Sequence, residues 1–175
     1  MKYSDIYRLY STSQPKDAIH QALREVSVDD SDEQYEDRSP LHLACQYGDT
    51  EGVKILLERD AEPNTKDANG STPIHILGRT SAGCADEDKL KEIAVVLMEH
   101  GANIPRSAKN TTALIECVRN RHFKMAEAII NSGTRVNSTD LNGENVLFGF
   151  CAASGDIRRD IRFAKKELDE SVQYS

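Results

Sequence analysis

Apolar residues recur along much of the chain at spacings of three and four, which is the pattern of helices with one buried face. One such stripe comprises Val53, Leu56 and Leu57. Another, near the end of the chain, comprises Ile157, Ile161, Ala164 and Leu168. Short polar segments separate the apolar stretches, so the pattern predicts a series of short helices.

Local signals indicate where these helices begin and end. Thr72 and Pro73 open a helix, because threonine caps free N–H groups and proline at the first helical position loses no hydrogen bond. Gly48 closes a short helix before the next one begins. Residues 67–70 (DANG) indicate a tight turn in which glycine supplies the positive φ. Each unit is therefore expected to be a helix, a turn, a second helix and a projecting hairpin loop.

These signals repeat along the chain. Residues 39–42 (SPLH) recur 33 positions later as 72–75 (TPIH), in weaker form as 112–115 (TALI), and again as 145–148 (NVLF). A second mark follows the first three copies, at residues 58–64, 99–103 and 131–137. A unit of this size cannot bury its apolar face alone, so neighbouring units must stack.

The chain resembles the ankyrin-repeat family, whose period is 33 and whose signature is T-P-L-H-x-A. The best copy begins at Ser39-Pro40-Leu41-His42-Leu43-Ala44, and the match covers about residues 34–156. The resemblance implies an all-α solenoid of stacked helix-turn-helix units with projecting hairpin loops. The expected organisation is an N-terminal helical cap and acidic connection (1–33), repeat one (34–66), repeat two (67–106), repeat three (107–139), and repeat four with a C-terminal capping helix (140–175).

Several departures from the pattern carry their own expectations. Repeat two has seven extra residues, within the polar segment 80–89, which we expect to be an exposed loop. Arg121 stands where repeat one has Gly48, so the turn of repeat three is less well specified. Asp60 replaces the glycine that closes the second helix, and aspartate tolerates the left-handed region better than most residues.

The N-terminal segment also resembles part of a repeat. Residues 3–27 align with the helical part of repeat one at an offset of 34, which places Tyr7 on Leu41 and Leu23 on Leu57. No hairpin precedes them, so this segment is expected to be a helical cap with a polar, solvent-exposed outer surface.

Composition limits the function. The net charge of −7 disfavours nucleic acid, because neutralising phosphates needs clustered Lys and Arg. The four cysteines include no CxxC pair, which favours reduced thiols in the cytoplasm or nucleus. No secretory signal is visible at the N-terminus, and no apolar run approaches the roughly 20 residues that span a bilayer. We therefore expect neither nucleic acid nor a membrane as partner.

Candidate chemistry is sparse. By the resemblance, His42 and His75 make structural hydrogen bonds, and no histidine pair shows the spacing of a metal-bound catalytic helix. Cys84, in the expected loop, is either an incidental exposed thiol or a redox site. The acidic stretch 29–37 is either a solvated connection or a contact for a basic partner. We predict no catalytic residues, no metal and no cofactor.

The resemblance implies binding of another protein through the hairpin tips and the inner face of the first helices. The matching positions are Tyr35, Glu36, Arg38, Gln46, Tyr47, Asn69, Ser71, Arg79, Lys109, Arg119, Asn120, Leu141 and Asn142. The first-choice anchors are Tyr35, Arg38 and Tyr47, because Tyr and Arg dominate interface energetics. The alternative for the two tyrosines is that they cover the stack between repeats.

Three functions are compatible with these patterns. The leading one is a non-catalytic adaptor or inhibitor, monomeric when free, which resembles small ankyrin proteins such as host-directed effectors and cell-cycle inhibitors. The second is a scaffold portion of a larger multidomain protein or complex. The third and weakest is an enzyme that uses the insertion in repeat two, which contains acids but no nucleophile-base pair.

Overall fold

The computed structural model describes residues 1–80, 86–104 and 112–133, and within them every regular element is a helix. The elements are α1 (Tyr3–Ser11), α2 (Lys16–Glu25), the 3-10 turn η1 (Glu33–Tyr35), α3 (Pro40–Gln46), α4 (Thr50–Glu58), α5 (Pro73–Arg79), α6 (Glu87–Glu99), α7 (Ala113–Arg119) and α8 (Phe123–Asn131). Repeat four and the expected C-terminal capping helix lie outside the described residues. The predicted all-α class is confirmed.

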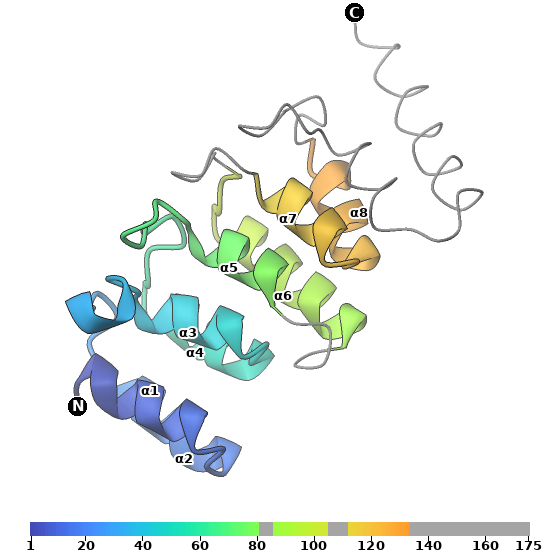
Figure 1. The fold of residues 1–175 in the computed structure, drawn as a ribbon. Helices are drawn as coiled ribbons and strands as arrows, with labels where there is room; N and C mark the ends of the chain where they lie inside the picture. Colours follow the sequence, from blue (N-terminus) through green and yellow to red (C-terminus); the bar gives the residue numbers. More distant parts are fainter. Residues whose placement is uncertain (81–85, 105–111, 134–175) are drawn as a thin grey trace, which may run out of the picture.

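The helices form two layers of stacked pairs (Figure 1). Helices α1, α3, α5 and α7 make one layer, in which α3 packs on α5 and α5 packs on α7. Helices α2, α4, α6 and α8 make the other layer in the same way. Each pair buries its apolar stripe between the layers and against the neighbouring pair, as a solenoid requires.

The cap pair consists of α1 and α2, which pack against each other. Leu23 is fully buried, as its alignment with Leu57 predicts. Tyr7 is only half-buried, whereas its neighbours Ile6 and Tyr10 turn into the core. Helix α1 is thus rotated relative to its alignment with α3.

A histidine ties the start of each motif-bearing helix to its cap. In repeat one the Nδ1 atom of His42 accepts the backbone N–H of Ser39 at 3.1 Å and lies 2.9 Å from the Ser39 hydroxyl. The proton therefore resides on Nε2, which donates to the carbonyl oxygen of Ser71 at 3.0 Å. Burial lowers the pKa of His42, which keeps the ring neutral. His75 repeats the contact with Thr72 in the next repeat, in line with the structural role expected of both histidines.

The turn of repeat three forms without glycine. Arg121 has φ 66°, close to the 60° of Gly48, and the turns close with matching backbone bonds. The N–H of Asp49 donates to the Ala44 carbonyl at 2.9 Å, and the N–H of His122 donates to the Cys117 carbonyl at 2.8 Å. The packing of α7 and α8 therefore imposes a left-handed conformation that arginine disfavours.

The bounds expected for the exposed loop, residues 80 and 89, are wrong at both ends. Thr80 is buried, and its hydroxyl donates to the carbonyl of Ile76 at 3.3 Å. Helix α6 already begins at Glu87, because the Asp86 side chain caps it by accepting the Asp88 N–H at 2.7 Å. Carboxylates in a first turn also interact favourably with the helix dipole. Residues 81–85, which include Cys84, lie outside the described part.

The remaining expectations about sites concern cysteines, metals and membranes. Cys45 and Cys117 are buried free thiols, and burial raises the pKa of both. Cys151 lies outside the described residues. Within those residues no group of three or more His, Cys, Asp or Glu side chains is arranged to hold a metal ion. None of the described helices is long and apolar enough to cross a bilayer.

Candidate protein-binding surface

The first two hairpin loops are joined to each other by a backbone hydrogen bond. The N–H of Ala68 donates to the Glu36 carbonyl at 2.8 Å. Within the second loop, the Asp67 carboxylate accepts the N–H groups of Asn69 at 2.9 Å and Ser71 at 2.8 Å. These bonds hold the loop that carries Ala68 and Asn69 in a fixed place beside repeat one.

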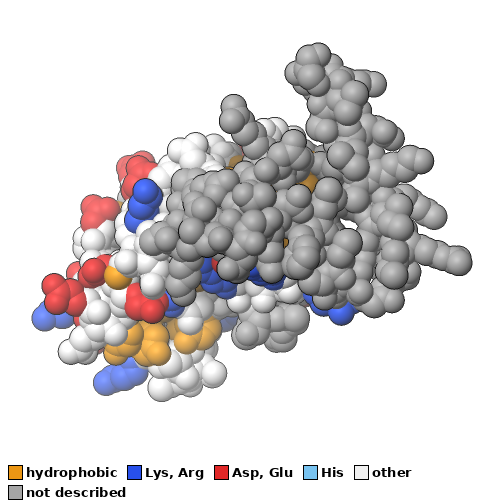
Figure 2. All heavy atoms as spheres, turned by 45° about the horizontal axis from the view of Figure 1, so that its top comes forward, with side chains coloured by type: hydrophobic (Ala, Val, Ile, Leu, Met, Phe, Trp, Pro, Cys, Tyr) orange, Lys and Arg blue, Asp and Glu red, His pale blue; other side chains and the backbone are white. Residues whose placement is uncertain are grey.

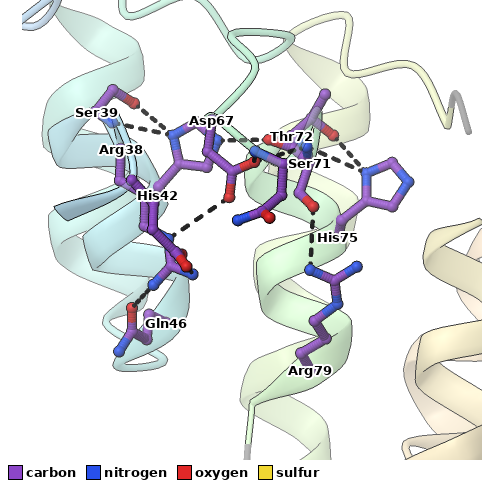
Figure 3. Close-up of polar contacts among 11 residues, drawn as sticks. Arg38, Ser39, His42, Gln46, Asp67, Ser71, Thr72, His75 and Arg79 are labelled. Atoms are coloured by element: carbon purple, nitrogen blue, oxygen red, sulfur yellow. Dashed lines mark hydrogen bonds and ion pairs between the residues drawn. The ribbon is translucent and has the colours of Figure 1, made fainter. Parts of the chain in front are cut away.

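Arg38 is held on the surface of α3 by three partners (Figure 3). Its guanidinium donates to the Gln46 side chain at 2.8 Å and to the Glu36 carboxylate, and its Nε lies 3.6 Å from the carboxylate of Asp67. The Arg38 side chain is 24% exposed. The guanidinium plane is thus oriented before any partner arrives.

Arg79 makes the equivalent contact in the opposite sense in repeat two. Positions 38 and 46 of repeat one correspond to positions 71 and 79 of repeat two, 33 residues later. Arg79 therefore reaches back to donate to the Ser71 hydroxyl at 3.0 Å, and it also pairs with Glu116 at 3.1 Å. Figure 3 shows the guanidinium groups of Arg38 and Arg79 at about the same level on neighbouring helices. We call Arg38, Gln46, Asp67, Ser71, Arg79 and Glu116 the inner-helix edge.

The rings of Tyr35 and Tyr47 pack against tyrosines of the cap. The Tyr35 ring is 4.2 Å from the ring of Tyr7 and 5.6 Å from that of Tyr3 between centroids. The Tyr47 ring stacks on Tyr10 at 4.8 Å with an interplanar angle of 11°. Both rings are half-buried, which is the geometry expected of tyrosines that cover the stack.

The other sequence-predicted positions differ in exposure. Asn69 is half-buried, Arg119 is exposed, and Asn120 donates its side-chain amide to the Gly78 carbonyl at 3.1 Å. Ser71 is buried, so it can act on a partner only by orienting Arg79. Lys109, Leu141 and Asn142 lie outside the described residues.

A second polar cluster, which the sequence pattern did not predict, joins the cap to repeat one. The buried Asp49 carboxylate accepts the Tyr10 hydroxyl at 2.8 Å, and both its oxygens lie 3.0 Å from Nε2 of His20. Burial and the charge of Asp49 raise the pKa of Tyr10, so this phenol stays protonated and donates. No motif marks this cluster, because Tyr10 and Asp49 are 39 residues apart.

Half of the acids in the acidic stretch 29–37 form hydrogen bonds or ion pairs within the chain. Asp30 accepts the Tyr3 N–H at 2.7 Å, Asp32 accepts the Gln34 N–H at 2.9 Å, and Glu36 binds Arg38. The other three acids of the stretch, Asp29, Glu33 and Asp37, are exposed. Figure 2 shows Asp and Glu side chains along one edge of the described part of the molecule, close to a group of hydrophobic side chains.

Comparison with known proteins identifies the repeat. The family profile described as ankyrin repeats (many copies) matches residues 23–77. The neurogenic locus notch homolog protein 1 of Mus musculus is 31% identical over 134 residues, 76% of this chain. The transient receptor potential cation channel subfamily A member 1 homolog of Caenorhabditis elegans is 46% identical over 48 residues, 27% of this chain. The human channel of that subfamily is 34% identical over 85 residues, 47% of this chain.

These relatives are far longer than the region they share with this chain. The matches cover 5% of the notch protein, 4% of the nematode channel and 7% of the human channel. The residues that the family profile matches include α3 and α4, the two helices of repeat one. The chain therefore belongs to the ankyrin-repeat family.

Proposed function

We propose that this ankyrin stack is a non-catalytic adaptor or inhibitor that binds a partner protein through its hairpin loops and the inner-helix edge. Ankyrin repeats are in general protein-interaction modules. The observation that carries the proposal is the pair of oriented guanidinium groups of Arg38 and Arg79 on neighbouring helices. Hydrogen bonds already order these side chains in the free protein. Less conformational entropy is therefore lost when a partner binds.

The roles of the histidines and cysteines also support a binding function. His42 closes a helix cap, His122 lies 2.7 Å from the Thr80 carbonyl through its Nε2, and the thiols of Cys45 and Cys117 are buried. Each of these groups is used in packing or in a structural bond. Two buried free thiols also fit a reducing compartment, so we place the function in the cytoplasm or nucleus.

A second candidate is that the stack is the scaffold portion of a longer protein. The observation in its favour is that the relatives carry the matching region within much longer chains. In that case the same surface would bind a partner, and the stack would connect that partner with the other parts of the longer protein.

Site-specific photo-crosslinking in the native cells tests the proposed surface. A benzophenone amino acid is introduced at Ala68, which is exposed on the hairpin loop, and in a matched variant at Lys91, which is exposed on α6 in the other helix layer. We expect the Ala68 variant to capture a protein that the Lys91 variant does not. Identical captured proteins from both positions would contradict the proposal. So would a capture at Ala68 that an Arg79→Gln substitution leaves unchanged.

A further inference from the structure

We propose that Asn69, in the second hairpin loop, is a site of spontaneous deamidation, and that the Asp67 side chain sets the rate of this reaction by holding the turn closed. The reaction needs no enzyme, cofactor or partner. It converts the neutral side-chain amide of Asn69 into a carboxylate or into an isoaspartate linkage. The inference follows from the residue after Asn69, from the contacts of its side chain, and from the bonds that fix the turn.

The residue that follows an asparagine controls access to the reacting nitrogen. Asparagine is chemically labile because the backbone nitrogen of the next residue can attack its side-chain carbonyl carbon, and a side chain on that next residue obstructs the approach. The described asparagines are 64, 69, 103, 120 and 131, and the residues after them are Thr, Gly, Ile, Arg and Ser. Among these five only Asn69 precedes a glycine, which has no Cβ atom. Asn142 also precedes a glycine, but it lies outside the described residues.

The Asn69 side chain breaks no hydrogen bond when it turns toward that nitrogen. In the part of the chain that the structure describes, the bond that Asn69 makes comes from its backbone N–H, and its side-chain amide makes none. Two other asparagines use their amides to join neighbouring repeats. Asn64 donates to the Gly101 carbonyl at 2.9 Å, and Asn120 donates to the Gly78 carbonyl at 3.1 Å. Deamidation at Asn64 or Asn120 must break such a bond first, whereas at Asn69 it need not.

The backbone nitrogen that would attack is held in the turn. The N–H of Gly70 donates to the Asp67 carbonyl at 2.8 Å, and the N–H of Asp67 donates to the Ser71 carbonyl at 2.9 Å. Gly70 has φ 67°, which a glycine adopts without strain. The nitrogen must lose its proton before it attacks, and in the closed turn this proton is bonded to a carbonyl. The closed turn therefore protects Asn69, and the reaction proceeds from the small population of opened turns.

The Asp67 side chain keeps this turn closed. One of its carboxylate oxygens accepts the N–H of Asn69 at 2.9 Å and that of Ser71 at 2.8 Å, and the side chain is fully buried. Bonds to an ionised acceptor are stronger than bonds between neutral groups. Replacing Asp67 removes both of these bonds, while the backbone bond from Ala68 to Glu36 still links the loop to repeat one. Opening of the turn should then become more frequent.

The covalent steps balance with water alone. Hydroxide removes the proton of the Gly70 nitrogen, which forms a bond to Cγ of Asn69. The bond from Cγ to the side-chain nitrogen breaks, and that nitrogen takes a proton from water and leaves as ammonia, which restores the hydroxide. Water then opens the resulting succinimide ring at either carbonyl carbon and gives aspartate or isoaspartate. One water is consumed, one ammonia is released, and nothing is oxidised or reduced.

The product changes the loop beside the inner-helix edge. Aspartate adds one negative charge at position 69, and isoaspartate adds one atom to the backbone between Asp67 and Ser71. The Ser71 hydroxyl accepts a hydrogen bond from Arg79 at 3.0 Å, so a displaced Ser71 would also release that guanidinium. An effect on partner binding rests on the proposed function, whereas the deamidation itself does not.

The test follows deamidation of the full 175-residue chain by mass spectrometry of its tryptic peptides, with a digest at time zero as the baseline. Asn69 lies in peptide 67–79, and Asn103, which is exposed but precedes Ile104, lies in peptide 92–106. At mildly alkaline pH we expect Asn69 to deamidate faster than Asn103 in the folded chain. In urea the rate at Asn69 should rise at least about tenfold, because the turn is then open.

Variants assign the protection to Asp67. Asp67→Ala should raise the rate at Asn69 in the folded chain about tenfold, the factor that corresponds to one hydrogen bond to a charged acceptor, and should leave the rate in urea unchanged. Asp86→Ala is the matched control, because the Asp86 carboxylate also accepts a backbone N–H, that of Asp88 at 2.7 Å, at the start of α6. This control should leave the rate at Asn69 unchanged, which excludes a general effect of lower stability.

Three results would overturn the inference. The first is a rate at Asn69 in the folded chain no higher than that at Asn103, and the second is an equal rate at Asn69 in water and in urea. The third is an unchanged rate in folded Asp67→Ala. If Asp67→Ala does not fold, Asp67→Asn takes its place, because asparagine keeps an acceptor oxygen and loses only the charge. This variant should raise the rate by a smaller factor, and an unchanged rate would count against Asp67 in the same way.

Discussion

Adding one methyl group at Gly52 measures how firmly the cap is tied to repeat one. Gly52 is the third residue of α4 and lies under the cluster formed by Asp49 and Tyr10. A Cβ atom at this position would be 2.7 Å from the Asp49 carboxylate and 2.9 Å from the Tyr10 hydroxyl oxygen. Both distances are shorter than such contacts allow, so Gly52→Ala must displace the carboxylate, the phenol or both.

The structure gives the size and sign of the effect. Alanine in a helix interior is about 1 kcal/mol more favourable than glycine, so propensity alone predicts a more stable protein. Against this, the buried Asp49 carboxylate loses a hydrogen bond from Tyr10, from His20 or from both. A hydrogen bond to a charged group contributes about 1.5–3 kcal/mol. Losing both outweighs the gain in propensity, and we expect Gly52→Ala to lower the free energy of unfolding by about 2 kcal/mol.

Urea unfolding of four variants checks this prediction. Glu51→Ala, an exposed neighbour in α4, is the control and should change stability by less than about 0.5 kcal/mol. Tyr10→Phe removes the hydroxyl that the methyl group strikes, so the effects of Gly52→Ala and Tyr10→Phe should be less than additive when the two changes are combined. If Gly52→Ala were more stable than the parent, the Asp49 cluster would contribute nothing and the prediction would be wrong.

Three further substitutions test other parts of the stack. Arg121→Gly should raise the free energy of unfolding by about 1 kcal/mol, because the residue has φ 66°; a loss of stability in urea unfolding would show that the arginine side chain matters more than its backbone. Burial lowers the pKa of His42, so the unfolded chain binds the proton more readily, and stability should fall as pH drops below about 6.5, by up to about 1.4 kcal/mol per pH unit. Urea midpoints between pH 7 and pH 5 measure this slope, and His42→Gln should flatten it; parallel slopes would contradict the assignment. Tyr47→Ala should lower the melting temperature because the stacked pair with Tyr10 is lost, while the exposed control Glu51→Ala should melt like the parent.

The parts of the fold that local signals determine could be predicted from the sequence. The start of α5 depends on Thr72 as the N-cap and Pro73 at the first helical position, which are adjacent in the sequence. The turn at Gly48 depends on the positive φ angle of that one residue. Such features repeat every 33 residues, so each copy supports the others. The turn at Arg121 shows the limit of local signals, because there the packing of α7 against α8 overrides the preference of the residue.

Contacts between distant residues could not be predicted in the same way. The burial of Asp49 depends on where the cap pair lies. The repeat pattern does not predict that position, because the cap matches only the helices of a repeat and not its hairpin. The start of α6 escaped prediction for a different reason. Polar residues with a small-residue start indicated a loop, but carboxylates are also what the first turn of a helix prefers, and Asp86 supplies the cap.

The structure separates the three first-choice anchors into two kinds. Tyr35 and Tyr47 contact tyrosines of the cap, so truncating either one would loosen the cap from repeat one, and a loss of binding in that variant would report the stack as much as the contact. Arg38 differs, because polar side chains hold it on α3 with part of its side chain exposed, and Arg79 reproduces this arrangement in the next repeat. A surface repeated in this way presents the same group at regular intervals, which packing alone does not require. We therefore place the proposed contact on the arginines, and we assign the tyrosines the task of keeping the first repeat rigid beneath them.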